Sequence, residues 1–256
     1  MSTSRLSPAE SAPDSSSLFT TTFVRYVART DGKEKLANAI GRIAQEMGAR
    51  SLLDLGAGDG TLTRLLSPFF QHILAVDKNS KFERSLRLIP NVTAAIARME
   101  EFVPPQKVDM ILMSYSTSGV QGARLGPFLA SLFDHLTPHG KILLATYQDG
   151  CAWDRFAGEV YGRLGIPRTG GEDRHRAQIE EVGLHAERVA ALDTFIWAPA
   201  LPALVDTLEF FFLPRINDYR ALREELVGTL EPFAEPLPGG EVGIKVVEVV
   251  LELLRT

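Results

Sequence analysis

The sequence has a single cysteine, Cys151, and no excess of positive charge. One thiol cannot form an intrachain disulfide or a multi-thiolate metal site. The 256 residues carry a formal net charge of −5, whereas sequence-independent nucleic-acid binding normally uses a basic face that neutralises phosphates. These absences argue against a disulfide scaffold and against a nucleic-acid partner, and they fit a reducing compartment such as the cytoplasm.

Long apolar runs are also missing. The longest, residues 195–205, contains two prolines and falls well short of the ~20 residues of a membrane-spanning helix. Residues 1–17 are rich in Ser, Pro and Ala and lack the apolar centre of a signal peptide, so we expect a flexible tail. We therefore expect no membrane partner and a cytoplasmic location.

The remaining composition is that of a core-forming protein, with 45% hydrophobic and 23% charged residues. Its length fits a single domain over residues 18–256. Apolar spacing predicts helices over 18–29 and 32–48, and short apolar runs then alternate with helical segments. The expected strands are 51–55, 72–76, 92–97, 109–113, 141–147, 190–197 and 242–251, and the expected helices between the first five are 62–70, 81–88 and 125–136.

This alternation predicts an α/β fold with a doubly wound, mostly parallel sheet of seven strands that is covered by helices on both faces. Residues 198–240 interrupt the pattern with helical segments just before the last strand. We expect them to form a helical insertion that could act as a lid.

The most informative segment, residues 51–61, reads Ser-Leu-Leu-Asp-Leu-Gly-Ala-Gly-Asp-Gly-Thr. Gly56, Gly58 and Gly60 follow a predicted strand, where glycine permits positive φ and lets a ligand approach the backbone closely. Such a ligand lies over a helix N-terminus at the carboxyl end of the sheet. Asp77 ends the next predicted strand, where a carboxylate can accept hydrogen bonds from both hydroxyls of an adenosine ribose.

The glycine spacing distinguishes between nucleotides. The dinucleotide fingerprint is G-x-G-x-x-G, whereas this chain has G-x-G-x-G with Thr61 in the last position. Asp54 and Asp59 add negative charge, which is unfavourable beside a pyrophosphate but suits a ligand that carries a sulfonium and an ammonium group. The phosphate-binding motif G-x-x-x-x-G-K-[ST] does not occur in the sequence.

The segment D-L-G-A-G-D-G, followed by Val76-Asp77, resembles motif I and the next acidic position of the class I, Rossmann-like, seven-strand S-adenosylmethionine-dependent methyltransferases. The resemblance implies S-adenosylmethionine as cofactor and a loop that lines its methionine moiety, with Asp77 on the ribose. It further implies that Met99 and Glu100 lie beside the adenine and that Ser114 lies where cofactor and acceptor meet. Lys78 stands where the family often has an apolar cover for the adenine. The full set of expected cofactor contacts is Asp54, Gly56, Ala57, Gly58, Gly60, Asp77, Lys78, Met99, Glu100 and Ser114.

Aromatic residues suggest an acceptor site. Tyr115 and Tyr147 stand at the ends of predicted strands, which face the ligand crevice in this architecture. We expect them to be catalytic residues that orient an acceptor through a hydroxyl or hold a cationic amine against a ring face. Residues 210–212, all Phe, could help to close the chamber. Other aromatics could line it, although such stripes also form ordinary core: Phe19, Phe23, Tyr26, Trp153 and Trp197.

We expect no metal site, because Pro138 separates His135 from His139 and no third ligand is evident. Ser114-Tyr115-Ser116 differs from the N/D-P-P-Y/F motif of enzymes that methylate amino groups of nucleic-acid bases.

The leading hypothesis is a methyltransferase acting on a nitrogen or oxygen atom of a small molecule. Two alternatives stay open: an enzyme of this fold that cyclises S-adenosylmethionine and releases methylthioadenosine, and a cofactor-binding protein without turnover. The sequence does not indicate the oligomeric state.

Overall fold

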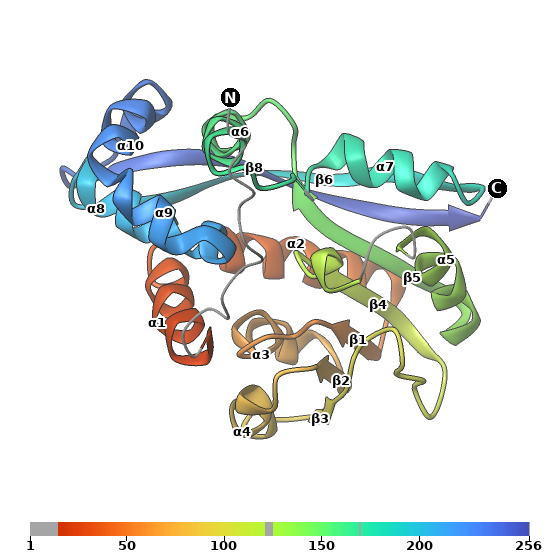
Figure 1. The fold of residues 1–256 in the computed structure, drawn as a ribbon. Helices are drawn as coiled ribbons and strands as arrows, with labels where there is room; N and C mark the ends of the chain where they lie inside the picture. The colour runs from red at the N-terminus through yellow and green to blue at the C-terminus, as the bar shows by residue number, and fades with distance from the viewer. Residues whose placement is uncertain (1–14, 121–124, 169, 256) are drawn as a thin grey trace, which may run out of the picture.

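The computed structural model describes residues 15–120, 125–168 and 170–255. At its centre is a sheet of eight strands in the order β3-β2-β1-β4-β5-β8-β6, with β7 paired to β8 (Figure 1). The strands are β1 (Ser51–Leu55), β2 (His72–Asp77), β3 (Val92–Ile96), β4 (Val108–Ser114), β5 (Leu136–Tyr147), β6 (Leu184–Ala198), β7 (Ala234–Pro236) and β8 (Val242–Arg255).

The first five strands are parallel, whereas β8 runs antiparallel to β5, β6 and β7. The sheet is thus the mostly parallel, Rossmann-like one predicted, with a short additional strand, β7. Strand order reverses between β1 and β4, and ligands of open α/β sheets bind outside the carboxyl ends of the strands at such a reversal. The fold therefore places a crevice at the glycine loop that follows β1.

Helices cover both faces of the sheet. One face packs under α2 (Gly32–Met47) and α3 (Thr61–Leu66), with Leu36, Ile40 and Leu66 fully buried. The other packs under α5 (Leu125–Leu132) and α7 (Glu172–Glu180), with Leu129 and Ile179 fully buried. The α-helices are α1 (Ser15–Val27), α2 (Gly32–Met47), α3 (Thr61–Leu66), α4 (Glu83–Arg87), α5 (Leu125–Leu132), α6 (Ala152–Leu164), α7 (Glu172–Glu180), α8 (Leu201–Leu208), α9 (Ile216–Ala221) and α10 (Arg223–Leu230). None of those formed by the described residues has the length and apolar character needed to span a membrane.

The boundaries depart from the prediction in several places. Strand β5 begins at Leu136 and not at Lys141, and α5 ends at Leu132, before the predicted residue 136. Residues 15–17 of the expected tail belong to α1, and residues 1–14 lie outside the described part of the chain. The strands β6 and β8 are longer than expected, because part of β6 alternates between buried and exposed residues and is not a continuous apolar run. Two helices, α6 and α7, were not predicted. The first carries apolar residues at helical spacing, whereas the second is mostly polar and buries Glu172 and His175.

The predicted insertion consists of α8, the 3-10 segment η6 (Glu209–Arg215), α9 and α10, and then β7. Its η6 and α8 pack against α1, so that two segments far apart in the sequence lie side by side (Figure 1). Arg25 of α1 donates to Glu209 at 3.0 Å, and Arg220 of α9 donates to the same carboxylate at 2.9 Å. The N-terminal helix and the insertion thus form one connected wall.

Candidate active site

The glycine loop adopts the left-handed conformation that its sequence suggests. The φ angles of Gly56 and Gly58 are 83° and 59°. A Cβ atom at Gly56 would lie 2.3 Å from the Cβ of Ser116, whereas one at Gly58 would meet no protein atom within 4 Å. The backbone is therefore packed closely at Gly56 and open toward free space at Gly58, as a loop that supports a ligand requires.

Asp77 joins this loop to the end of β2. Its Oδ2 accepts from the Gly58 N–H at 2.9 Å, and its Oδ1 accepts from the Asn79 N–H at 2.8 Å. A carboxylate has about four lone-pair positions, so both oxygens can accept a further hydrogen bond. Asp77 can therefore hold the loop and bind the two hydroxyls of a ribose at the same time.

Two other carboxylates give the loop its negative charge. Asp54 is almost fully buried and accepts from the Thr63 hydroxyl at 2.7 Å, and burial raises the pKa of Asp54 to about 6. Asp59 accepts from both the backbone N–H and the hydroxyl of Thr61, at 2.9 and 2.8 Å. A cationic ligand is thus favoured beside the loop.

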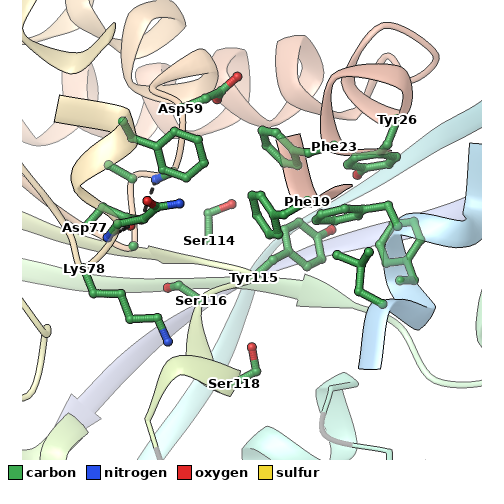
Figure 2. Close-up of a pocket in the computed structure, with 18 of the residues that line it drawn as sticks. Phe19, Phe23, Tyr26, Asp59, Asp77, Lys78, Ser114, Tyr115, Ser116 and Ser118 are labelled. Atoms are coloured by element: carbon green, nitrogen blue, oxygen red, sulfur yellow. Dashed lines mark hydrogen bonds between the residues drawn. The ribbon is translucent and has the colours of Figure 1, made fainter. Parts of the chain in front are cut away.

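A cavity of about 1330 Å³ opens in front of the glycine loop and extends to α1 and η6. Ligand pockets usually measure about 300–1,000 Å³, so this one has room for a cofactor and a second small molecule. Figure 2 shows Asp77 and Lys78 at one side, Phe23 and Tyr26 at the other, and Ser114 between them. The predicted residues that line the cavity are Asp54, Gly56, Ala57, Gly58, Asp77, Lys78, Met99, Glu100, Ser114, Tyr115, Phe19, Phe23 and Tyr26.

Four predicted residues lie outside the described lining. A Cβ at Gly60 would lie within 3 Å of Leu86 and Ile89, so that glycine serves helix packing. Tyr147 is not among the residues that line the cavity, and its ring packs against Gly170. This placement does not support a catalytic role for Tyr147.

Neither tryptophan belongs to the described lining of the cavity. Trp153 is buried, and its ring centroid lies 4.4 Å from that of Phe211, which does line the cavity. Trp197 lies in β6 opposite Gly243, and its backbone N–H donates to Arg29. Neither position supports direct contact with an acceptor.

The acceptor side of the cavity is a wall of aromatic rings from α1 and η6. The ring centroid of Phe210 lies 5.5 Å from those of Phe19 and Tyr26 and 5.1 Å from that of Phe23. Phe211 meets Tyr26 edge-on at 4.9 Å. These contacts build an apolar chamber from two segments that lie far apart in the sequence. Phe212, by contrast, is fully buried in the core.

Tyr115 stands where the two parts of the cavity meet. Its φ angle of 55° is unusual for a residue with a side chain, and strain of this kind is concentrated at functional sites. Its hydroxyl donates to the Thr146 carbonyl at 3.2 Å, and burial raises the pKa of Tyr115 well above its usual value. The Tyr115 ring is therefore held in place, and its hydroxyl stays protonated, where it lines the cavity.

Two charged residues near Tyr115 were not predicted from the sequence. Lys33 of α2 lines the cavity, with its Nζ 5.4 Å from the centroid of the Tyr115 ring. Glu248 of β8 is 4% exposed, its Oε2 has no hydrogen-bond partner among the described residues, and burial raises its pKa to about 7. A charged residue inside Val-Val-Glu-Val-Val is a signal for Glu248, whereas nothing in the sequence around Lys33 marks it.

Comparison with known proteins identifies the family of the chain. A family described as a methyltransferase domain matches residues 24–178, which is more than half of the chain. A relative from Mycobacterium tuberculosis, named an uncharacterized methyltransferase, is 34% identical over 123 residues, which are 46% of this chain and 49% of the relative. The match thus spans about half the length of this relative.

Solved structures show the same fold. The YcgJ protein of Bacillus subtilis superposes with a TM-score of 0.58 at 16% identity, covering 86% of this chain and 99% of that one. The mitomycin 7-O-methyltransferase MmcR superposes with a TM-score of 0.50 at 15% identity, covering 86% and 54%. The open backbone at Gly58, the acidic loop and the free lone pairs of Asp77 fit an adenosyl sulfonium. The chain therefore belongs to the methyltransferase domain family, and S-adenosylmethionine is its cofactor.

Proposed function

We propose that the chain is an enzyme that transfers the methyl group of S-adenosylmethionine to a nitrogen or oxygen atom of a small molecule. The observation that carries this proposal is the continuity of the cavity. Its acidic glycine-loop part and its aromatic chamber meet at Ser114 and Tyr115, and the total volume of about 1330 Å³ suits two ligands together. A protein that only bound the cofactor would not need the second chamber.

The bound cofactor supplies an electrophilic methyl group, and the protein contributes alignment and exclusion of water. The glycine loop and Asp77 fix the nucleoside, while Tyr115 forms the floor below the reacting atoms. The rings of Phe19 and Phe210 cover the acceptor chamber from two different elements. An apolar or aromatic acceptor fits such walls, and the net charge of −5 argues against a nucleic-acid acceptor.

The test is to incubate the protein with S-adenosylmethionine alone and then with panels of phenols and amines, and to identify the products by mass spectrometry. Formation of S-adenosylhomocysteine together with a methylated acceptor supports the proposal. Formation of methylthioadenosine would instead favour an enzyme that cyclises the cofactor. The Gly58→Val variant is the matched control. Its side chain would project into the free space of the cavity and should abolish turnover, and the backbone strain at this positive φ, roughly 1–3 kcal/mol, should leave the chain folded.

A further inference from the structure

Lys33 is an unusual residue in the cavity because its charge has no direct partner. Its Nζ lies over the ring of Tyr115, and it forms no hydrogen bond or ion pair with any residue that the structure describes. A lysine on a solvated surface is free to move, whereas this one is half-buried at the junction of the cofactor and acceptor parts. The arrangement leaves its nitrogen available to a ligand.

The carboxylates near Lys33 come from three elements, and none of them forms an ion pair with its Nζ among the contacts of the described residues. Asp54, at the end of β1, is bonded to Thr63, and Asp59, in the loop, is bonded to Thr61. Glu248 of β8 lies behind the cavity floor and is not part of the described lining. Burial lowers the pKa of Lys33, while the attraction of Glu248, Asp59 and Asp54 opposes that change.

The surroundings of Lys33 discriminate between classes of acceptor. A cationic amine held against Tyr115 would lie beside a second amino group, because the Lys33 Nζ is 5.4 Å from this ring, and any proton on Lys33 would repel it. An aromatic hydroxyl compound fits better, because its ring matches the chamber of Phe19, Phe210 and Tyr26 and its oxygen can receive a hydrogen bond from Lys33. Developing negative charge on that oxygen would be stabilised by the same group.

We propose that the acceptor is an aromatic hydroxyl compound and that Lys33 is the catalytic residue that takes its proton and holds the resulting phenolate beside the methyl group. This inference rests on the proposed methyltransferase function. The neutral Lys33 amine accepts the hydroxyl proton and becomes an ammonium ion. An oxygen electron pair then forms the O–CH₃ bond, while the pair of the C–S bond remains on sulfur. The ammonium proton finally passes to solvent through the open side of the cavity.

The first experiment measures ionisation rather than turnover. The protein loaded with S-adenosylhomocysteine is titrated with 4-nitrophenol and with 7-hydroxy-4-methylcoumarin, whose absorbance distinguishes phenol from phenolate. A cation at hydrogen-bond distance lowers the pKa of an acid by roughly 1–3 units, so the bound probes should ionise at lower pH than the free ones. Lys33→Met should remove the shift, and Lys81→Met, which changes an exposed lysine outside the cavity, should keep it. Failure of both probes to bind, or equal ionisation in wild type and Lys33→Met, would overturn the inference.

The second experiment excludes a role for Lys33 in holding the cofactor. Methylthioadenosine lacks the amino-acid moiety of S-adenosylhomocysteine, so the affinities of both are measured by calorimetry for wild type and Lys33→Met. The inference expects both affinities to change less than twofold. A loss of affinity for S-adenosylhomocysteine of fivefold or more, with methylthioadenosine unchanged, would assign Lys33 to the cofactor carboxylate and overturn the inference.

The third comparison separates proton transfer from charge stabilisation. Lys33→Arg keeps the positive charge but does not accept a proton, so it should still lower the pH at which the bound probes ionise. At a pH below that ionisation, where the phenol still carries its proton, it should methylate the coumarin roughly 10²-fold more slowly or worse. Methylation at the wild-type rate would refute the proton transfer. A wild type that binds the cofactor but methylates only amines would refute this inference and leave the proposed function intact, whereas a wild type that releases only methylthioadenosine would refute the proposed function itself.

Discussion

Replacement of Glu248 by glutamine should change how the stability of the protein depends on pH. Burial raises the pKa of this carboxyl from its ordinary value of 4.5 to about 7 in the folded protein, and attraction to Lys33 limits the rise. Folding therefore favours the protonated form. As pH increases from 4.5 to about 7, the unfolded chain releases the proton while the folded protein retains it, so the free energy of unfolding falls.

The size of this loss follows from the two pKa values, which differ by about 2.5. Each unit of pKa corresponds to about 1.36 kcal/mol, so the wild type should lose about 3 kcal/mol of stability across this range because of Glu248. The contribution is complete below pH 4.5 and absent above pH 7. Glu248→Gln should lack it, and the variant should therefore gain stability relative to wild type as pH rises.

Urea unfolding at half-unit steps from pH 4 to pH 8 measures this difference. Asp54, whose pKa is also raised, is present in both proteins, so its effect cancels when one curve is subtracted from the other. Glu252→Gln, on the same strand but paired with Lys141 at 2.8 Å, is the matched control for replacing a glutamate of β8. Parallel curves for wild type and Glu248→Gln would refute the assignment of Glu248 as a buried, unpartnered acid.

Three further substitutions test the rest of the site. Asp77→Ala should weaken binding of S-adenosylhomocysteine by roughly 1–3 kcal/mol, because ribose hydroxyls lose their acceptor, and unchanged affinity in calorimetry would refute the ribose assignment. Gly58→Val should abolish that binding while the circular dichroism spectrum stays that of the folded protein, and retained binding would mean that the cofactor lies elsewhere. Glu209→Gln removes the carboxylate that Arg25 and Arg220 share, and both arginines are partly exposed, so a loss of roughly 1 kcal/mol is expected. Hydrogen exchange in α1 should become faster, and an unchanged exchange rate would show that this ion cluster does not hold the wall together.

Much of the fold could be predicted because buried parallel strands leave a clear pattern. The runs at β1, β2 and β4 are apolar almost throughout, and their predicted ends agree with the structure to within a residue. The half-exposed strand β6 gives no such run, and α7 buries Glu172 and His175 where an apolar stripe would be expected. Local pattern thus fails where tertiary contacts, such as the ion pairs of Glu172 with Arg176 and Arg188, replace apolar burial.

The candidate site divides in the same way. The glycine loop and Asp77 are local features of the sequence, so their positions in the cavity could be anticipated. Tyr147 is the last residue of β5, whereas Tyr115 comes directly after β4 with a positive φ, so nearness to a strand end does not decide which way either side chain points. Tyr115 enters the cavity, whereas Tyr147 is covered at Gly170. Position along a strand was therefore sufficient to predict which residues line the cofactor side of the cavity, and insufficient to predict those of the acceptor side.

The distribution of charge in the cavity bears on the direction of the reaction. Asp54, Asp59 and Asp77 lie on the cofactor side, and Lys33 lies where the acceptor is proposed to bind. Methyl transfer removes the positive charge of the sulfonium, so the acidic loop attracts the cofactor more strongly before the reaction than after it. On the other side, methylation turns a phenolate into a neutral ether and ends its attraction to Lys33. Both products therefore lose the electrostatic contact that held the reactants, which favours their release from the same cavity.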